Sequence, residues 1–259
     1  MSNLRFYSPE KLRQGELSVG VQVRLSENAA THATRVMRLN VGDKLFLFDG
    51  SGFDFECELV SVQKNATHAK VLSAKEIQNE SPINIVLLLG ISSADRMDIG
   101  IQKAVELGVN KIVPIKTERS VVKLDEEKSK KRVEHWQNVV IAACEQSGRA
   151  KVPLVSRPDS LSVWLQNNSK GYSSDVDLIS AKRTRILLNP IGAKKLSELR
   201  KPQGDIELLI GPEGGLSDKE IALAISHDFQ SIILGARVLR TETAPLAAIA
   251  TMNTLWGDF

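Results

Sequence analysis

The residues Ile206-Glu207-Leu208-Leu209-Ile210-Gly211-Pro212-Glu213-Gly214-Gly215 decide the fold class of this chain. An apolar run that ends in three glycines and a proline predicts a buried strand leading directly into a tight loop. Glycine lets the main chain approach a ligand closely, and proline fixes the direction in which the chain enters the loop. The glycine spacing fits neither a dinucleotide loop nor a phosphate loop, which disfavours phosphate cofactors. The alternative interpretation is an ordinary connection between a strand and a helix.

Strands and helices alternate around this segment, from residue 83 onward. The alternation is typical of an α/β fold with a mostly parallel sheet covered by helices on both faces. Ser217 and Glu220 form a capping box, which predicts that a helix begins there. The other predicted strands lie at residues 83–89, 112–115, 186–188 and 231–234, and the other predicted helices at residues 95–107, 129–147 and 246–256.

The N-terminal residues have a different pattern, which predicts a small β-barrel. Apolar residues alternate with polar or small ones, as half-buried strands require, and Gly50 and Gly52 predict a hairpin turn. The predicted strands lie at residues 17–25, 45–47, 53–59 and 68–72, with one helical candidate at residues 26–39. The predicted organisation is a barrel at residues 1–73, a polar linker at residues 74–82 and the α/β domain at residues 83–259.

The composition is that of an ordinary globular protein, with 42% hydrophobic and 25% charged residues. The formal net charge of +3 is too small to indicate a nucleic-acid partner by itself. No apolar run approaches the ~20 residues of a membrane span, and no signal-peptide pattern opens the chain. The two cysteines, Cys57 and Cys144, lie in different patterns without neighbours at metal-ligand spacing. We therefore expect a cytoplasmic protein without a disulfide, a metal site or a membrane association.

A second polar segment follows the predicted strand at residues 231–234. Charged and hydroxyl residues at positions 240–243 lie between that apolar strand and an apolar helix, where burial is costly unless each group has a partner. Thr241 is explained equally well as a cap of the last helix, and Glu242 as an acidic residue near its N-terminus. Arg240 has no comparable local explanation.

These two segments together resemble the paired C-terminal motifs of the RsmE family, bacterial enzymes of the SPOUT superfamily that methylate N3 of a uridine in 16S ribosomal RNA. Further similar segments follow the family order along almost the whole chain, at residues 5–7, 32–38, 96–98, 101–108, 117–120 and 142–149. Met37 stands where Leu is usual in the family. Ser92 and Ser93 stand where Gly or Lys often precedes the first long helix, which weakens any role for a lysine there.

The resemblance implies a PUA-like RNA-binding barrel followed by a SPOUT domain with a deep trefoil knot that binds S-adenosylmethionine. It also implies a homodimer and, as partner, 16S rRNA within the assembled small ribosomal subunit. Two alternatives remain open. One is methylation of another RNA atom or another RNA on the same fold. The other is a non-catalytic RNA-binding assembly factor, although such a protein does not need the polar set at residues 240–243.

The family resemblance also implies which residues bind the cofactor, mainly through main-chain groups at three strand ends. Leu234 and Leu239 are expected to sandwich the adenine, while Glu213 either contacts the ribose hydroxyls or is solvated. The implied cofactor-binding residues are Leu188, Asn189, Pro190, Ile210, Gly211, Pro212, Glu213, Gly215, Leu234, Gly235, Val238, Leu239 and Thr243.

Two residues are implied in catalysis. Negative charge spreads to O2 and O4 of uracil as the N3 proton leaves, and Arg240 is expected to stabilise it. Glu242 is the better candidate for accepting the proton, since an arginine stays charged; capping of the last helix remains an equal alternative.

RNA binding is expected at the N-terminal unit and at one helix end. Basic residues commonly bind phosphate, and an exposed tyrosine can stack on a base. Arg149 is explained equally well as a cap of its helix. The residues implied in RNA binding are Arg5, Tyr7, His32, Arg35, Arg38 and Arg149.

Overall fold

The computed structural model describes residues 4–9, 19–63, 66–120, 122, 125–168, 183–191 and 194–259. The chain divides into two compact units. The first comprises Met1–Glu80 and Ile141–Val152, and the second comprises Ser81–Val140 and Pro153–Phe259. The first unit therefore includes a short segment from the middle of the chain.

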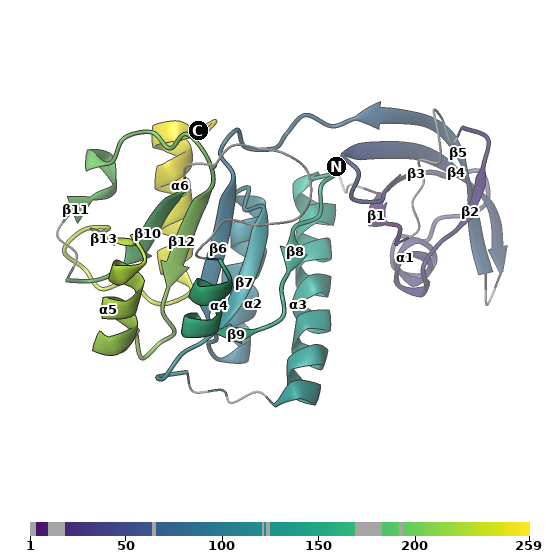
Figure 1. Ribbon diagram of the computed structural model, residues 1–259. Helices are drawn as coiled ribbons and strands as arrows, with labels where there is room; N and C mark the ends of the chain where they lie inside the picture. Colours follow the sequence, from purple (N-terminus) through teal and green to yellow (C-terminus); the bar gives the residue numbers. More distant parts are fainter. Residues whose placement is uncertain are drawn as a thin grey trace. The chain divides into compact units, whose positions relative to one another are not determined.

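The first unit contains a five-stranded sheet in the order β1-β3-β4-β5-β2 (Figure 1). β1 pairs with β3 in parallel, and the other neighbours are antiparallel. Gly50 and Gly52, between β3 and β4, have φ angles of 83° and 94°, which confirms the predicted hairpin. The strands are β1 (Arg5–Tyr7), β2 (Gln22–Arg24), β3 (Lys44–Phe48), β4 (Phe53–Gln63) and β5 (Ala66–Glu76).

Two elements of this unit differ from the prediction. The helix expected at residues 26–39 is divided into α1 (Glu27–Thr31) and a π-helical turn (His32–Val36). Its β-branched residues disfavour a regular helix, and Arg38 ends it with a φ of 57°. The strand expected at residues 17–25 is reduced to β2, because Val19 and Val21 are 48% and 50% exposed and bury no common face. Leu17, also assigned to that strand, lies outside the described residues.

β5 continues to Glu76, and so extends three residues into the segment 74–82 that the sequence assigns to a linker. The strands of the first unit share one core with the adjoining helical residues. That core contains Phe6, Leu45, Leu47, Phe55, Leu59, Ala29 and Ala33.

The second unit contains an eight-stranded sheet in the order β11-β13-β10-β12-β6-β7-β8, with β9 beside β7. The pairings described in this sheet are parallel, as predicted. β12 has the predicted bounds, and the other predicted strands are found within two residues of theirs. The strands are β6 (Ile85–Gly90), β7 (Lys111–Lys116), β8 (Leu154–Val155), β9 (Asp159–Ser160), β10 (Thr184–Leu188), β11 (Lys194–Lys195), β12 (Ile206–Ile210) and β13 (Gln230–Ile233).

Helices cover both faces of this sheet, as Figure 1 shows. Val86 and Leu88 of β6 share a core with residues of α4 and α5 on one face, and Leu89 faces Gly100 of α2 on the other. The capping box at Ser217 and Glu220 is formed as predicted. The helices are α2 (Ala94–Glu106), α3 (Glu126–Ser147), α4 (Leu161–Asn167), α5 (Asp218–Ser226) and α6 (Thr243–Trp256), with a 3-10 turn at Leu196–Glu198.

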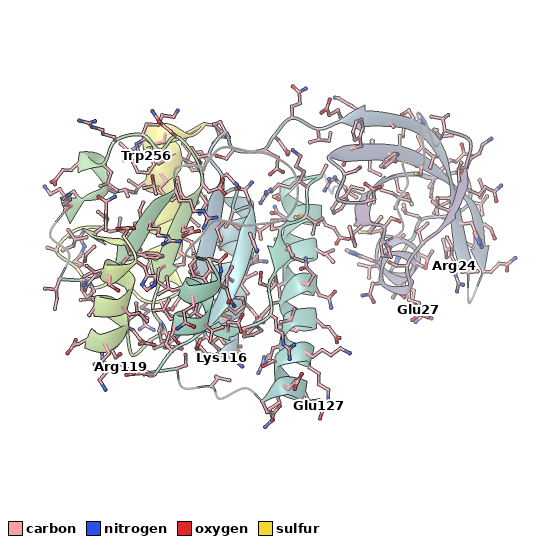
Figure 2. All side chains as sticks on the ribbon, in the orientation of Figure 1. Arg24, Glu27, Lys116, Arg119, Glu127 and Trp256 are labelled. Atoms are coloured by element: carbon pink, nitrogen blue, oxygen red, sulfur yellow. The ribbon has the colours of Figure 1, made fainter. Side chains whose placement is uncertain are left out.

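The carboxyl ends of the parallel strands meet at one edge of the sheet, where open α/β sheets bind their ligands. Figure 2 shows this edge near Lys116, the last residue of β7, and Arg119, whereas Trp256 at the end of α6 lies at the opposite end of the unit. α6 begins three residues earlier than predicted because Pro245, in its first turn, is compatible with a helix start. The N-terminus of α6 is thereby placed at the same edge as the glycine-rich loop.

In the part of the chain that the structure describes, no helix combines the length and the apolar character required to cross a bilayer. Nor do three or more His, Cys, Asp or Glu side chains of that part gather where they could hold a metal ion. Cys57 and Cys144 are buried and free, and burial raises the pKa of each thiol to about 12.

Candidate active site

A cavity of about 700 Å³ lies at the carboxyl edge of the second unit's sheet. Its wall is formed mainly by the connections that follow β10, β12 and β13, together with Arg96 from α2 and Arg119 after β7. This volume is within the range of pockets that bind small ligands. Every wall residue that the structure describes belongs to the second unit.

The structure brings together all but one of the residues predicted to bind the cofactor. Thr243 is the exception, since it is the exposed first residue of α6 and lies off the wall. The predicted residues on the wall are Leu188, Asn189, Pro190, Ile210, Gly211, Pro212, Glu213, Gly215, Leu234, Gly235, Val238 and Leu239.

The main chain that follows β13 is open to a ligand. Among the described residues, none forms a main-chain hydrogen bond with residues 235–239. Gly235 has a φ of 125°, a conformation that side-chain-bearing residues rarely adopt. Unpaired N–H and C=O groups beside half-exposed Leu234 and Leu239 suit a flat heterocycle that is held by its faces and recognised at its edge.

The loop after β12 is held rigidly by close main-chain packing. A Cβ on Gly211 would lie 3.0 Å from main-chain atoms of Gly215 and Leu216, and a Cβ on Gly90 would lie 2.5 Å from the Pro212 nitrogen. Thr241 donates its hydroxyl hydrogen to the Gly211 carbonyl over 2.9 Å. The suggestion that Thr241 caps the last helix is therefore wrong.

Glu213 is fixed on this loop by the start of α2. Its Oε1 accepts hydrogen bonds from the Ser93 main-chain N–H (2.9 Å) and hydroxyl (2.8 Å). Burial opposes ionisation of the carboxyl, but these hydrogen bonds and the nearby Arg96 charge outweigh it and lower the pKa. Its other oxygen, Oε2, is buried without a hydrogen-bond partner in the described structure. The carboxylate is thus anionic and belongs to a residue of the cavity wall.

The two predicted catalytic residues differ in position. Arg240 is exposed and lines the cavity. Glu242 is not among the described residues of the cavity wall. Its Oε2 is buried, has no hydrogen-bond partner in that part of the chain and lies 3.8 Å from Nε of Arg96. Glu242 occupies the N-cap position of α6, but its side chain makes no capping hydrogen bond. The carboxylate therefore lies at the helix N-terminus, where the helix dipole favours an acidic residue even without a capping hydrogen bond, so this explanation and a catalytic role both stay open.

Sequence reasoning did not assign a role to three arginines of the wall, Arg96, Arg119 and Arg237. Arg119 donates hydrogen bonds to the carbonyls of Gly214 and Leu216, so it braces the glycine-rich loop. Arg96 and Arg119 belong to segments that resemble the family, and this resemblance is the sequence signal that could have indicated a role for them. Their roles depend on a loop that lies far along the chain.

Two of the predicted RNA-binding arginines have structural roles instead. Arg5 is 5% exposed and pairs with Asp54, and it donates hydrogen bonds to the carbonyls of Cys144 (2.8 Å) and Arg149 (2.9 Å). Arg149 is 4% exposed and pairs with Glu80. Buried guanidinium groups with carboxylate partners are not available to phosphate, so these two assignments are wrong.

The other predicted RNA-binding residues remain accessible. His32, Arg35 and Arg38 are exposed in and after the π-helical turn. Tyr7 is half-buried against Phe48, with ring centroids 5.5 Å apart. His32 packs against Phe6 in a T-shaped arrangement, with ring centroids 5.4 Å apart.

Comparisons with known proteins agree with this site. Residues 79–253 match the RNA methyltransferase domain family, and residues 25–72 match the RNA methyltransferase PUA domain. The chain is 35% identical to ribosomal RNA small subunit methyltransferase E of Bacillus subtilis over 224 residues, 86% of each protein. It is 34% identical to the protein of the same name from Buchnera aphidicola over 243 residues, 93% of this chain and 94% of that one.

Solved structures give the same result. The fold is similar to ribosomal RNA small subunit methyltransferase E from Neisseria gonorrhoeae bound to S-adenosyl methionine, with a TM-score of 0.85 and 42% identity over 98% of each chain. It is also similar to a Legionella pneumophila protein described as a methyltransferase and bound to the same cofactor, with a TM-score of 0.89 and 35% identity over 100% of each chain. By the matched domains, the overall identity and the shared fold, this chain belongs to the ribosomal RNA small subunit methyltransferase E family.

Proposed function

We propose that this protein transfers a methyl group from S-adenosylmethionine to N3 of a specific uridine in 16S ribosomal RNA. The observation that carries the proposal is the cavity at the carboxyl edge of the second unit's sheet. Its wall holds Arg240 and nearly all of the residues that the family resemblance assigns to the cofactor. Two structures that share the fold contain this cofactor.

The residues of the cavity fit the cofactor chemically. Leu234 and Leu239 offer apolar contacts to the adenine, and the unpaired main chain of residues 235–239 can recognise its edge. The anionic carboxylate of Glu213, a residue of the cavity wall, is a hydrogen-bond acceptor suited to a ribose hydroxyl or to the amino group. When bound, the cofactor supplies a methyl group on a positively charged sulfur, which is already reactive.

The protein's own groups then have two tasks at the uracil. The N3 proton must leave, and the proposed acceptor is Glu242, which lies two residues after Arg240 but outside the described cavity wall, because an arginine stays charged. Negative charge that develops on O2 and O4 is stabilised by the Arg240 guanidinium, which carries several donors in one plane. The Arg240 side chain has no hydrogen-bond or ion-pair partner among the described residues, so it is free to meet the uracil.

RNA binding is assigned to the first unit. His32, Arg35 and Arg38 supply phosphate contacts, and Tyr7 supplies a stacking surface. The proposal further includes an RNA-binding barrel at residues 1–73 and a knotted methyltransferase domain at residues 83–259. It also includes a homodimer, a cytoplasmic location and the assembled small subunit as the substrate form of the RNA; the family resemblance supports these parts.

The test is to incubate the protein with methyl-labelled S-adenosylmethionine and 16S rRNA, either free or in assembled small subunits. The RNA is then digested, and the labelled nucleotide is mapped by mass spectrometry. We expect label on N3 of one uridine and more label in assembled subunits than in free RNA. Label on another atom or on a 2′-hydroxyl would refute the proposed specificity. Cofactor binding without any transfer would indicate a binding protein instead.

A further inference from the structure

The connection between β6 and α2 contacts both loops of the candidate site. Ser93 donates two hydrogen bonds to Glu213 of the glycine-rich loop, and the hydroxyl groups of Ser92 and Thr241 are 3.4 Å apart. One turn further along α2, Arg96 lies near carboxylates of both loops. Its Nη1 is 3.4 Å from Oε1 of Glu213, and its Nε is 3.8 Å from Oε2 of Glu242.

Arg96 places one positive charge near both carboxylates. The side chains of Glu213 and Glu242 are 18% and 19% exposed, and each has a buried Oε2 without a hydrogen-bond partner. Among the described residues, Arg96 is the one cation that forms an ion pair with either carboxylate. Burying a carboxylate without a cation is costly, and two carboxylates close to one point repel each other.

We propose that Arg96 is a positioning residue of the site. Its guanidinium attracts the carboxylates of the Glu213 loop and of the Glu242 segment and thereby sets the orientation of both. This inference rests on the proposed function. Each carboxylate meets a different nitrogen of the same guanidinium, so the planar group spans the two loops in a way that a single ammonium cannot. The distances are longer than hydrogen bonds, and catalytic contacts commonly tighten when ligands bind.

Arg240 and Arg96 therefore have different roles in the proposed site. Arg240 has no hydrogen-bond or ion-pair partner in the described ranges and is available to the substrate, whereas Arg96 acts on Glu213 and Glu242 and through them on cofactor and uracil. Loss of Arg96 is therefore expected to change the cofactor affinity through Glu213 and the methylation rate through Glu242. RNA affinity is expected to stay the same, because the proposed phosphate contacts lie in the first unit.

Two double-mutant cycles in the full-length protein test this assignment. The first combines Arg96→Gln with Glu213→Gln and measures cofactor affinity by calorimetry. The second combines Arg96→Gln with Glu242→Gln and measures single-turnover methylation at saturating cofactor and RNA. Arg96→Lys tests whether charge alone is sufficient. Lys103→Gln is the matched control, since it removes an ion pair with Glu106 from the same helix without touching the cavity wall.

We expect Arg96→Gln to lower the single-turnover rate about tenfold or more, equivalent to at least one step of about 1.4 kcal/mol in the barrier. Each double variant should be no worse than its glutamate single variant, because the arginine acts on cofactor affinity through Glu213 and on the saturated rate through Glu242. Arg96→Lys should recover little, and Lys103→Gln should behave as the unaltered protein.

Additive losses in both cycles would overturn the proposal, because they would mean that Arg96 touches cofactor or RNA directly. A full recovery in Arg96→Lys, or an equal loss in Lys103→Gln, would overturn it as well. If the unaltered protein binds cofactor but labels no uridine, the proposed function fails, and the affinity cycle with Glu213 still decides the role of Arg96.

Discussion

The four arginines of the cavity wall differ in what they contact. Arg96 lies near two carboxylates, and Arg119 donates hydrogen bonds to main-chain carbonyls. The side chains of Arg237 and Arg240 have no hydrogen-bond or ion-pair partner in the described part of the chain. A guanidinium that is already paired stabilises the loops that it contacts, whereas one that is unpaired beside a cavity is available to a ligand. By this difference both Arg237 and Arg240 are available to a ligand, and the family resemblance proposes Arg240 as the group that meets the substrate charge.

Replacement of Arg240 by alanine is expected to lower the methylation rate far more than either affinity. The guanidinium is needed mainly when the uracil becomes anionic, so its contribution appears in the transition state. Removing one such electrostatic group commonly costs on the order of a hundredfold in rate. Single-turnover methylation at saturating cofactor and RNA measures the loss, and separate titrations measure the affinities.

Arg200→Ala is a suitable control, since Arg200 is exposed and lies outside the cavity wall. Arg240→Lys should recover little of the rate, because an ammonium does not reproduce the planar fork. If Arg240→Ala keeps its turnover or loses only cofactor affinity, Arg240 belongs to the cofactor pocket and the rate enhancement must be sought at Glu242.

At the level of elements, the site consists of loops whose shapes have different physical causes. The loop after β12 depends on close main-chain packing, since a Cβ at Gly211 would meet main-chain atoms at 3.0 Å. The loop after β13 depends on backbone conformation, since Gly235 has a φ of 125° and a Cβ there would meet nothing within 4 Å. The two glycines are therefore required for different reasons.

Substitution of either glycine by valine is expected to weaken cofactor binding while the protein still folds. Valine at Gly211 displaces residues 215–216, and valine at Gly235 shifts the main chain that faces the cavity. Calorimetric titration with cofactor measures the effect, and circular dichroism checks the fold. Gly42→Val in the first unit, with a φ of 93° and nothing near its Cβ position, carries similar backbone strain away from the cavity. Equal affinity in a folded Gly211→Val protein would show that this glycine serves packing alone.

The C-terminal end of α3 carries a second testable element. Glu145 accepts a hydrogen bond from the Tyr7 main-chain N–H over 2.9 Å. Burial raises the pKa of its carboxyl, against the opposing effects of that hydrogen bond, His32 and Arg5. The folded state therefore binds the proton more tightly than the unfolded state, and stability decreases as pH rises from the ordinary carboxyl pKa through the raised one.

Glu145→Gln is expected to remove this decrease, because the amide oxygen still accepts the hydrogen bond but does not ionise. Urea unfolding between about pH 4 and pH 7, the range above an ordinary glutamate pKa, measures the difference. The variant should be at least as stable as the unaltered protein at neutral pH. Glu134→Gln, at an exposed position of the same helix, serves as control. A marked loss of stability at neutral pH in Glu145→Gln would mean that the ionised form is favoured in the fold.

At the scale of the whole molecule, cofactor and RNA functions are assigned to different units. The described residues of the cavity wall all belong to the second unit. The exposed basic residues His32, Arg35 and Arg38 belong to the first unit. Changes to the basic residues of the first unit should therefore leave the cofactor site intact.

A double replacement, Arg35→Ala with Arg38→Ala, is expected to weaken RNA binding and to flatten its dependence on salt. Each lost phosphate contact lowers the slope of log K against log salt by roughly 0.7 to 0.9. RNA titrations at several salt concentrations measure the slope, and calorimetry should give an unchanged cofactor affinity. Lys70→Ala with Lys75→Ala removes the same charge from exposed positions on β5 of the same unit. An unaltered slope in the arginine variant, or the same change in the lysine variant, would reject these contacts.

Local patterns predicted the elements well where one physical signal dominated. The β12 strand and its glycine-rich loop, the capping box at Ser217 and the hairpin at Gly50 all depend on residues that are neighbours in the chain. Elements with weak local signals were missed: β1, β8, β9 and β11 have two or three residues each, and α4 has seven. Such short segments gain most of their stability from tertiary contacts, which a local pattern does not contain.

The sequence by itself determined the α/β class, the division into two parts, the family and most of the cavity wall, because strand ends and glycine-rich loops leave local signals. Only the tertiary structure decided which charged groups are buried and paired. The sequence pattern suggests that Arg5 is a free basic residue. In the fold it donates hydrogen bonds to the carbonyls of Cys144 and Arg149, which lie 139 and 144 residues further along the chain. Likewise, Arg96 meets Glu213 and Glu242 only after the strands have assembled. A charge becomes structural or functional through desolvation and through its partner, and both are properties of the folded chain.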